Sequence, residues 1–153
     1  MDNTHEAFMR IALEEARKAA RKDEVPVGAV LVRNGKVIAK GRNCRENKKD
    51  PLGHAEIVAI RKGARRLGGW RLVGCTLYVT LEPCPMCMGA IINARIPAVV
   101  YGTRDPKAGA AGSLYDLNEG KLNHTTDMTE GILREECSMI LKEYFAAKRR
   151  KKK

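Results

Sequence analysis

Two short segments of the chain carry side chains that bind metal ions and move protons. The first is His-Ala-Glu at residues 54–56, and the second is Pro-Cys-Pro-Met-Cys at residues 83–87. Cysteines three positions apart share one face of a helix, and a helix N-terminus favours the thiolate form that binds metal. One imidazole and two thiolates make a three-ligand zinc site whose fourth position is open to water. The spacing therefore predicts a catalytic zinc site formed by His54, Cys84 and Cys87.

Glu56 follows His54 by two positions, and residues two apart do not share a face of a helix. Glu56 is therefore poorly placed to bind the metal and better suited to moving protons. Zn²⁺, two thiolates and a neutral imidazole sum to zero charge, so a bound water can ionise near neutral pH (pKa about 7 instead of 15.7). We expect Glu56 to accept that proton, which leaves a zinc-bound hydroxide, and general acid–base help of this kind contributes about 10²–10⁴ in rate.

A closed structural zinc site is the first alternative, because it needs only a fourth protein ligand. The other cysteines are available for that role, although none has a second ligand close to it in the sequence: Cys44, Cys75 and Cys137. The second alternative leaves Cys84 and Cys87 as a buried or redox pair. The combination of His-Ala-Glu with a strand that leads into Pro-Cys favours the catalytic metal site over both.

Alternating helices and strands are predicted to position these two segments. Apolar periodicity indicates helices over residues 6–22, 54–67, 84–94 and 132–148. Strands are indicated over residues 25–33, 36–42, 75–81 and 97–102, with a further short strand near 124–128. Asn34-Gly35 joins the first two strands and is a strong hairpin signal, because both residues must tolerate positive φ. The pattern predicts an α/β domain of three layers, in which helices cover both faces of a mixed five-stranded sheet.

The charge of the chain indicates a polyanionic partner. Twenty-nine basic and eighteen acidic residues give a net charge of +11, and the six basic residues 148–153 account for only part of it. The alternative is a solvated tail that aids solubility. Aromatic residues make up 5% of the chain, too few for a broad base-stacking platform, and Trp70 is expected to be buried packing. We divide the chain into one domain, residues 1–147, and a basic tail, residues 148–153.

The sequence also predicts where the protein resides. No apolar run approaches the roughly 20 residues that a membrane span needs, and no basic segment followed by an apolar one marks a secretory signal. Five cysteines in such a chain suggest metal binding or burial rather than a disulfide framework. We therefore expect a cytoplasmic protein with no membrane partner.

The order His-x-Glu followed by Pro-Cys-x-x-Cys resembles the signature of the zinc nucleoside and nucleobase deaminases. The resemblance implies the three-layer cytidine-deaminase-like fold. It also implies one Zn²⁺ per subunit, held by His54, Cys84 and Cys87, with Glu56 as the proton shuttle.

Four further stretches look like the bacterial tRNA-specific adenosine deaminases: residues 24–30, 76–84, 101–107 and 112–114. The likeness runs from about residue 7 to residue 145. It implies a homodimer that converts the wobble adenosine of a tRNA anticodon loop to inosine. By the same resemblance, Val27 and Asn43 line the base pocket, while Asp105 and Lys107 lie in a loop that meets neighbouring nucleotides.

Simpler interpretations of the substrate residues stay open. Asn43 can end a strand, Val27 can fill the core, and Asp105-Pro106 can form an ordinary turn. Two other functions also stay open: deamination of free guanine, cytosine or a nucleotide, and RNA binding without catalysis around a structural zinc. The positive charge favours an RNA substrate, because a base in a single-stranded loop is easily splayed out while lysines and arginines hold the phosphates.

Overall fold

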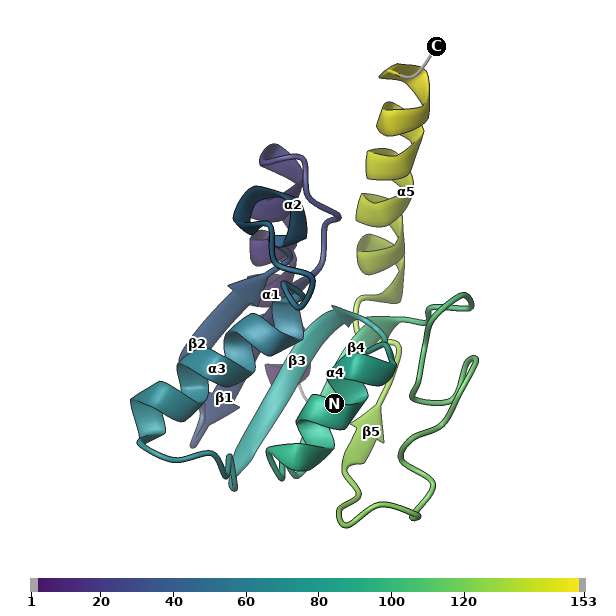
Figure 1. The fold of residues 1–153 in the computed structure, drawn as a ribbon. Helices are drawn as coiled ribbons and strands as arrows, with labels where there is room; N and C mark the ends of the chain where they lie inside the picture. Colours follow the sequence, from purple (N-terminus) through teal and green to yellow (C-terminus); the bar gives the residue numbers. More distant parts are fainter. Residues whose placement is uncertain (1–2, 152–153) are drawn as a thin grey trace.

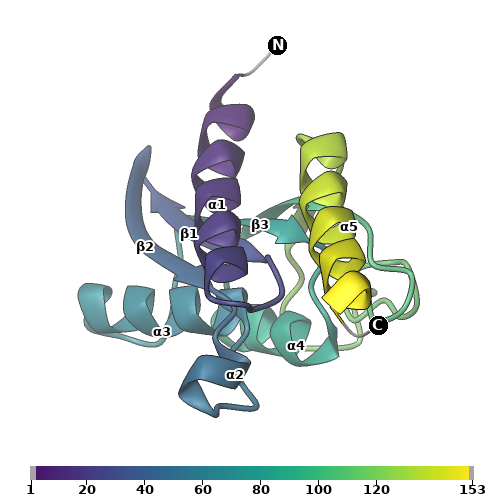
Figure 2. The ribbon, with the colours of Figure 1, turned by 90° about the horizontal axis from the view of Figure 1, so that it is seen from above.

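The computed structural model describes residues 3–151 and contains five strands and five helices in that range. The strands are β1 (Gly28–Arg33), β2 (Lys36–Arg42), β3 (Cys75–Leu81), β4 (Ala98–Thr103) and β5 (Asp127–Thr129). The helices are α1 (Thr4–Arg21), α2 (Arg45–Lys48), α3 (Ala55–Leu67), α4 (Pro85–Asn93) and α5 (Arg134–Lys151). The sheet forms the middle layer; α1 and α5 cover one face, and α3 and α4 cover the other (Figures 1 and 2). The predicted three-layer α/β fold is confirmed.

The sheet is mixed, with strand order β2-β1-β3-β4-β5. β1 pairs antiparallel with β2 and β3, whereas β3, β4 and β5 run parallel. The β1–β2 turn has positive φ at Asn34 (52°) and Gly35 (74°), which confirms the predicted hairpin. Because β3 and β4 are parallel, their carboxyl ends meet at one edge of the sheet. The segments that follow these two strands therefore lie close together.

The core lies on both faces of the sheet. In β1, Val30 and Val32 pack in the cluster that includes residues of α1 and α5. Ala29 and Leu31 point the other way and pack in the cluster that includes residues of α3 and α4. Successive side chains of a strand face opposite sides, so a strand covered on both faces is apolar along its whole length. This double burial fixes the strands whose ends carry the site.

Helix α5 differs from its expected range at both ends. It begins at Arg134 rather than near residue 132, because Leu133 and Gly131 adopt positive φ (54° and 86°) that a right-handed helix excludes. It continues to Lys151, because its last residues are good helix formers whose charge suits the C-terminal dipole. Residues 152–153 lie outside the described range, so the division into a domain and a basic tail stays a prediction. None of the helices within residues 3–151 is long and apolar enough to cross a membrane.

The expectation that Trp70 is buried is wrong. Its side chain is 57% exposed and lies on the surface connection that follows the end of α3 at Gly68. The guanidinium carbons of Arg71 and Arg95 lie 4.8 and 5.7 Å from its ring centroid, which is a cation–π arrangement. The buried position of this connection is taken by Leu72, which is fully inaccessible to solvent.

Candidate active site

His54, Cys84 and Cys87 meet where two helices begin. His54 is the extended N-cap residue of α3, Cys84 is the extended N-cap residue of α4, and Cys87 lies in the first turn of α4. His54 Nδ1 lies 3.6 Å from the Sγ atom of Cys84 and 3.5 Å from the Sγ atom of Cys87. The extended caps turn both side chains toward the same point, while the helices behind them fix the backbone.

These three side chains fit a zinc ion. Tetrahedral zinc with Zn–N of about 2.05 Å and Zn–S of about 2.3 Å holds its nitrogen and sulfur ligands about 3.6 Å apart. The three ligand atoms lie within 4.8 Å of one another, and no other His, Cys, Asp or Glu of residues 3–151 joins this group. The remaining cysteines lie elsewhere, so the closed structural site finds no support. The arrangement leaves one coordination position for water.

The cluster already favours a thiolate at Cys84. Hydrogen bonds that the Cys84 thiolate accepts from Cys87 and from His54 lower the pKa of this thiol to about 4 despite partial burial. The same contact acts oppositely on Cys87, because donating to Cys84 and being buried both raise its pKa. The hydrogen bond with Cys84 is also the largest influence that raises the pKa of His54. The thiolate is the metal-binding form of cysteine, so the site is prepared for a cation.

Glu56 lies in the first turn of α3 and is 4% exposed. Burial raises the pKa of its carboxyl group to about 7, and the negative charge of Cys84 acts in the same direction. A carboxyl group that titrates near neutral pH can both accept and donate a proton during a reaction. Its position beside the cluster, but outside the set of ligand atoms, suits proton transfer rather than metal binding.

A cavity of about 310 Å³ opens above the cluster. His54, Glu56 and Cys84 line it, and so do three of the four residues predicted to bind substrate: Val27, Asn43 and Asp105. The fourth, Lys107, does not line this cavity. It lies in an adjoining depression between the segment after β4 and helix α5.

The simpler interpretations of these residues also have structural counterparts. Asn43 accepts a hydrogen bond at Oδ1 from the N–H of Ala55 at 2.9 Å, which satisfies the first turn of α3 directly behind His54. Val27 is 4% exposed and belongs to the core cluster as well as to the cavity wall. Asp105 Oδ1 accepts from the backbone N–H of Lys107 at 3.0 Å, as in an ordinary Asx turn. Each of the three therefore has a structural role at the cavity edge.

Comparison with known proteins places this geometry in a family. Residues 3–149 match the family described as MafB19-like deaminase. The tRNA-specific adenosine deaminase of Bacillus subtilis is 48% identical over 149 residues, covering 97% of this chain and 92% of that protein. The tRNA-specific adenosine deaminase of Haemophilus influenzae is 48% identical over 150 residues, covering 97% and 87%. The chain belongs to the tRNA-specific adenosine deaminases.

Solved structures support this membership in the tRNA-specific adenosine deaminases. A structure from a study of A-to-I editing by tRNA:A34 deaminases at the wobble position is 46% identical, with a TM-score of 0.85, and covers 88% of this chain and 99% of that one. A guanine deaminase from Nitrosomonas europaea is 27% identical, with a TM-score of 0.81, and covers 92% and 84%. The same fold therefore occurs in deaminases named for different purines.

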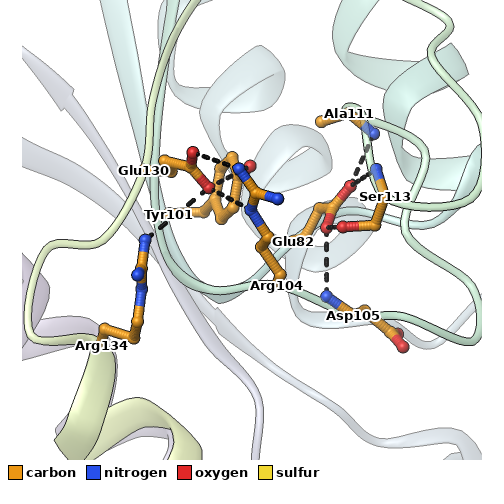
Figure 3. A network of polar contacts seen from close by, with 8 residues as sticks. All are labelled: Glu82, Tyr101, Arg104, Asp105, Ala111, Ser113, Glu130 and Arg134. Atoms are coloured by element: carbon orange, nitrogen blue, oxygen red, sulfur yellow. Dashed lines mark hydrogen bonds and ion pairs between the residues drawn. The ribbon is translucent and has the colours of Figure 1, made fainter.

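Two buried carboxylates of this tRNA adenosine deaminase hold the cavity walls, and sequence reasoning missed both. Glu24 (3% exposed) accepts from the backbone N–H groups of Glu46 at 3.2 Å and Asn47 at 2.6 Å, at the wall that contains α2. Glu82 (2% exposed) accepts from backbone N–H groups of the segment after β4, which also contributes to the cavity lining (Figure 3). The available signal was a single acidic residue beside an apolar strand, which is too common in sequences to single out.

Helix α5 contributes three side chains to the cavity of this deaminase that were also not predicted: Tyr144, Phe145 and Lys148. The Tyr144 hydroxyl donates to the backbone carbonyl of Asp23 at 3.1 Å, and Lys148 Nζ lies 3.4 Å from the Asp23 carboxylate. These contacts tie the far end of the chain to the turn after α1. A cation of the C-terminal run is thereby placed beside the cavity.

A second network in the deaminase holds the start of the segment after β4 (Figure 3). Arg104 donates two parallel hydrogen bonds to the Glu130 carboxylate, from Nε at 2.6 Å and from Nη2 at 2.7 Å. Tyr101 donates to the same carboxylate at 3.2 Å. The guanidinium lowers the pKa of Glu130 to about 2, so the pair stays charged at neutral pH. The residue before Asp105 is therefore anchored to the strand β5 side of the sheet.

Proposed function

We propose that this enzyme hydrolyses adenosine to inosine at the wobble position of tRNA anticodons, with Zn²⁺ held by His54, Cys84 and Cys87. The observation that carries the proposal is the meeting of these three side chains at the floor of a cavity. The imidazole nitrogen of His54 lies 3.6 and 3.5 Å from the two cysteine sulfurs, next to the buried carboxyl group of Glu56. Curated relatives at 48% identity bear the name tRNA-specific adenosine deaminase. That name supports the choice of base and carrier.

The residues divide the chemical work. When bound, zinc acts as a Lewis acid that lowers the pKa of the attacking water. The Glu56 carboxylate accepts a proton from that water and delivers it to the ring nitrogen of adenine as the water oxygen bonds to C6. Glu56 then carries the second proton of the water to the exocyclic nitrogen, which leaves as ammonia while the C6 carbonyl of inosine forms. Its raised pKa supports this role, because one group must both take up and release protons.

Three residues of the cavity and Lys107 in the adjoining depression are proposed to hold the substrate. Val27 and Asn43 contact the adenine, and Asp105 and Lys107 lie along the path of the neighbouring nucleotides. The excess of basic residues, including Lys148 at the cavity, attracts the phosphates. A base in an anticodon loop is already unpaired, so drawing it into the cavity costs less than extracting it from a duplex.

The test is incubation of the zinc-loaded enzyme with an anticodon stem-loop RNA, followed by mass spectrometry of the nucleosides. Inosine at the wobble position is the expected product. Free adenosine, guanine and cytosine are assayed in parallel, because the similarity to a guanine deaminase makes free guanine the second candidate substrate. Turnover of a free base with none on the RNA would overturn the proposal.

The homodimer and the cytoplasmic location are further proposals that follow from the family and its tRNA substrate. Size-exclusion chromatography with light scattering checks the first: we expect about twice the 17.0 kDa of one chain. A single-chain mass for the active enzyme would contradict it. Imaging of a tagged chain in its own cells checks the second.

A further inference from the structure

Glu82 lies directly after β3 and two residues before Cys84, with its carboxylate buried at the cavity. Its oxygens accept hydrogen bonds from the backbone N–H groups of Asp105 at 3.1 Å, Ala111 at 2.9 Å and Ser113 at 3.1 Å. The Ser113 hydroxyl is a fourth donor to the same carboxylate (Figure 3). One side chain thus gathers three separate points of the segment after β4.

The nearby guanidinium of Arg104 interacts with this buried charge through space, but its ion pair is formed with Glu130. Within residues 3–151, no lysine or arginine nitrogen forms an ion pair with Glu82. A buried carboxylate without an ion-pair partner is stable only where hydrogen-bond donors surround it, so its charge depends on the segment that supplies the donors. The converse also holds: the segment has one favourable position, the one in which its N–H groups point at Glu82.

The segment after β4 also forms one wall of the cavity that is proposed to receive the nucleobase. Asp105 and Ala108 line the cavity. The N–H of Gly109 donates to the Asp105 carbonyl at 2.8 Å, and the N–H of Ala110 donates to the Pro83 carbonyl at 2.8 Å. A Cβ atom at Gly109 would collide with the carboxyl group of Glu82. The wall therefore packs directly on this carboxylate, and a shift of one moves the other.

We propose that Glu82 is a positioning residue that sets the substrate-facing wall formed by Asp105 and Ala108. The inference rests on the proposed function, because the wall is the part of the cavity assigned to nucleotides beside the target base. Within residues 3–151, the side chain of Glu82 forms no hydrogen bond with Glu56 or with the three proposed metal ligands. Its loss should weaken binding of the RNA and spare the proton transfers of Glu56.

The variant Glu82→Gln tests this inference. Glutamine has the same shape but loses the charge and turns an N–H₂ group toward N–H donors, so hydrogen bonds to the wall are lost. For the zinc-loaded enzyme with an anticodon stem-loop, we expect KM and the dissociation constant to rise about tenfold. The single-turnover rate at saturating RNA should stay within about threefold of the parent, with one zinc per chain.

Two further variants make the result specific. Ser113→Ala removes one of the four donors, so KM should rise in the same direction by a smaller factor, and this variant keeps the test decisive if Glu82→Gln does not fold. Glu15→Gln is the matched control, because Glu15 is also a buried carboxylate (4% exposed) but pairs with Lys18 and Arg42 and lies outside the cavity lining. It should leave KM and the single-turnover rate unchanged.

The outcomes separate the inference from the proposed function. A fall in the single-turnover rate with unchanged KM and dissociation constant would indicate a general structural role and overturn the inference. Unchanged binding in both Glu82→Gln and Ser113→Ala would do the same. An inactive parent enzyme would instead overturn the proposed function, and the dissociation constants, which require no turnover, would still decide the role of Glu82.

Discussion

The floor of the active site, formed by the proposed metal ligands, and the walls of its cavity are built in different ways. The floor consists of side chains at the N-caps and first turns of two helices. Each helix fixes its own ligands through local backbone geometry. The walls include the short helix α2 and the irregular segment after β4, whose backbone N–H groups are held by the carboxylates of Glu24 and Glu82 respectively. The helix ends give a fixed geometry for catalysis. The carboxylates hold the wall segments proposed to contact the RNA, so changes to the two regions should affect different kinetic constants.

The largest effect is expected from removing one of the proposed metal ligands at the floor of the site. Cys87→Ala leaves one imidazole and one thiolate, which are too few ligands for a stable zinc site, so zinc content and deamination should both fall to the detection limit. Metal analysis and the stem-loop assay measure the two losses. Cys75→Ala is the matched control, because Cys75 is equally buried but lies outside the ligand group. Full zinc and activity in Cys87→Ala would remove it from the ligand set.

Glu56→Ala should abolish catalysis while the metal stays bound. The loss of a general acid–base group predicts a rate about 10²–10⁴-fold lower, with one zinc per chain and unchanged affinity for the stem-loop. Single-turnover kinetics, metal analysis and an RNA titration on the same preparation check the three parts. Loss of zinc in this variant would contradict the assignment of Glu56 as a proton shuttle outside the metal ligands.

Asn43 belongs to both regions, and two substitutions separate its roles. Asn43→Ala removes the acceptor for the N–H of Ala55, so we expect a loss of about 1 kcal/mol in the free energy of unfolding as well as weaker substrate binding. Asn43→Asp keeps an oxygen acceptor at the N-terminus of α3 and should retain most of that stability, but it lacks the amide donor for the base. Denaturant unfolding and KM measure the two roles. Equal KM values for parent and Asn43→Asp would exclude the amide from base recognition.

The smallest effect is expected at the C-terminal cations. Deleting residues 149–153 leaves the contacts of Lys148 with Asp23 intact and removes five positive charges. Stem-loop affinity should fall modestly, and the slope of log affinity against log salt should decrease by about 0.7 for each phosphate that the tail no longer neutralises. Binding measured at several salt concentrations checks this. An unchanged slope would mean that the tail only aids solubility.

The meeting of His54, Cys84 and Cys87 could be predicted from the sequence because its signals are local. The His-x-Glu and Pro-Cys-x-x-Cys spacings correspond directly to positions on helix N-termini, and Asn34-Gly35 corresponds directly to a hairpin turn. The roles of Glu24 and Glu82 depend on partners 22 to 31 residues away, and no local pattern encodes such pairs. Trp70 was misplaced for a related reason: one of its two cation–π partners, Arg95, lies in the segment after α4, and no local pattern announces that contact.

Because Glu82 accepts hydrogen bonds from backbone N–H groups, it constrains which substitutions the segment after β4 can accept. Peptide N–H groups are present whatever the side chain, so most residues between 105 and 113 can be exchanged without releasing the segment. The exceptions are Gly109, where any larger residue would strike the carboxylate, Gly112, whose φ of 127° strains other residues, and Ser113, whose hydroxyl is itself a donor. Mutation can thus reshape the surface that meets the nucleotide while its frame persists. A change from one purine to another would then need new side chains on this segment and no new backbone, and the same fold does occur in deaminases named for adenosine and for guanine.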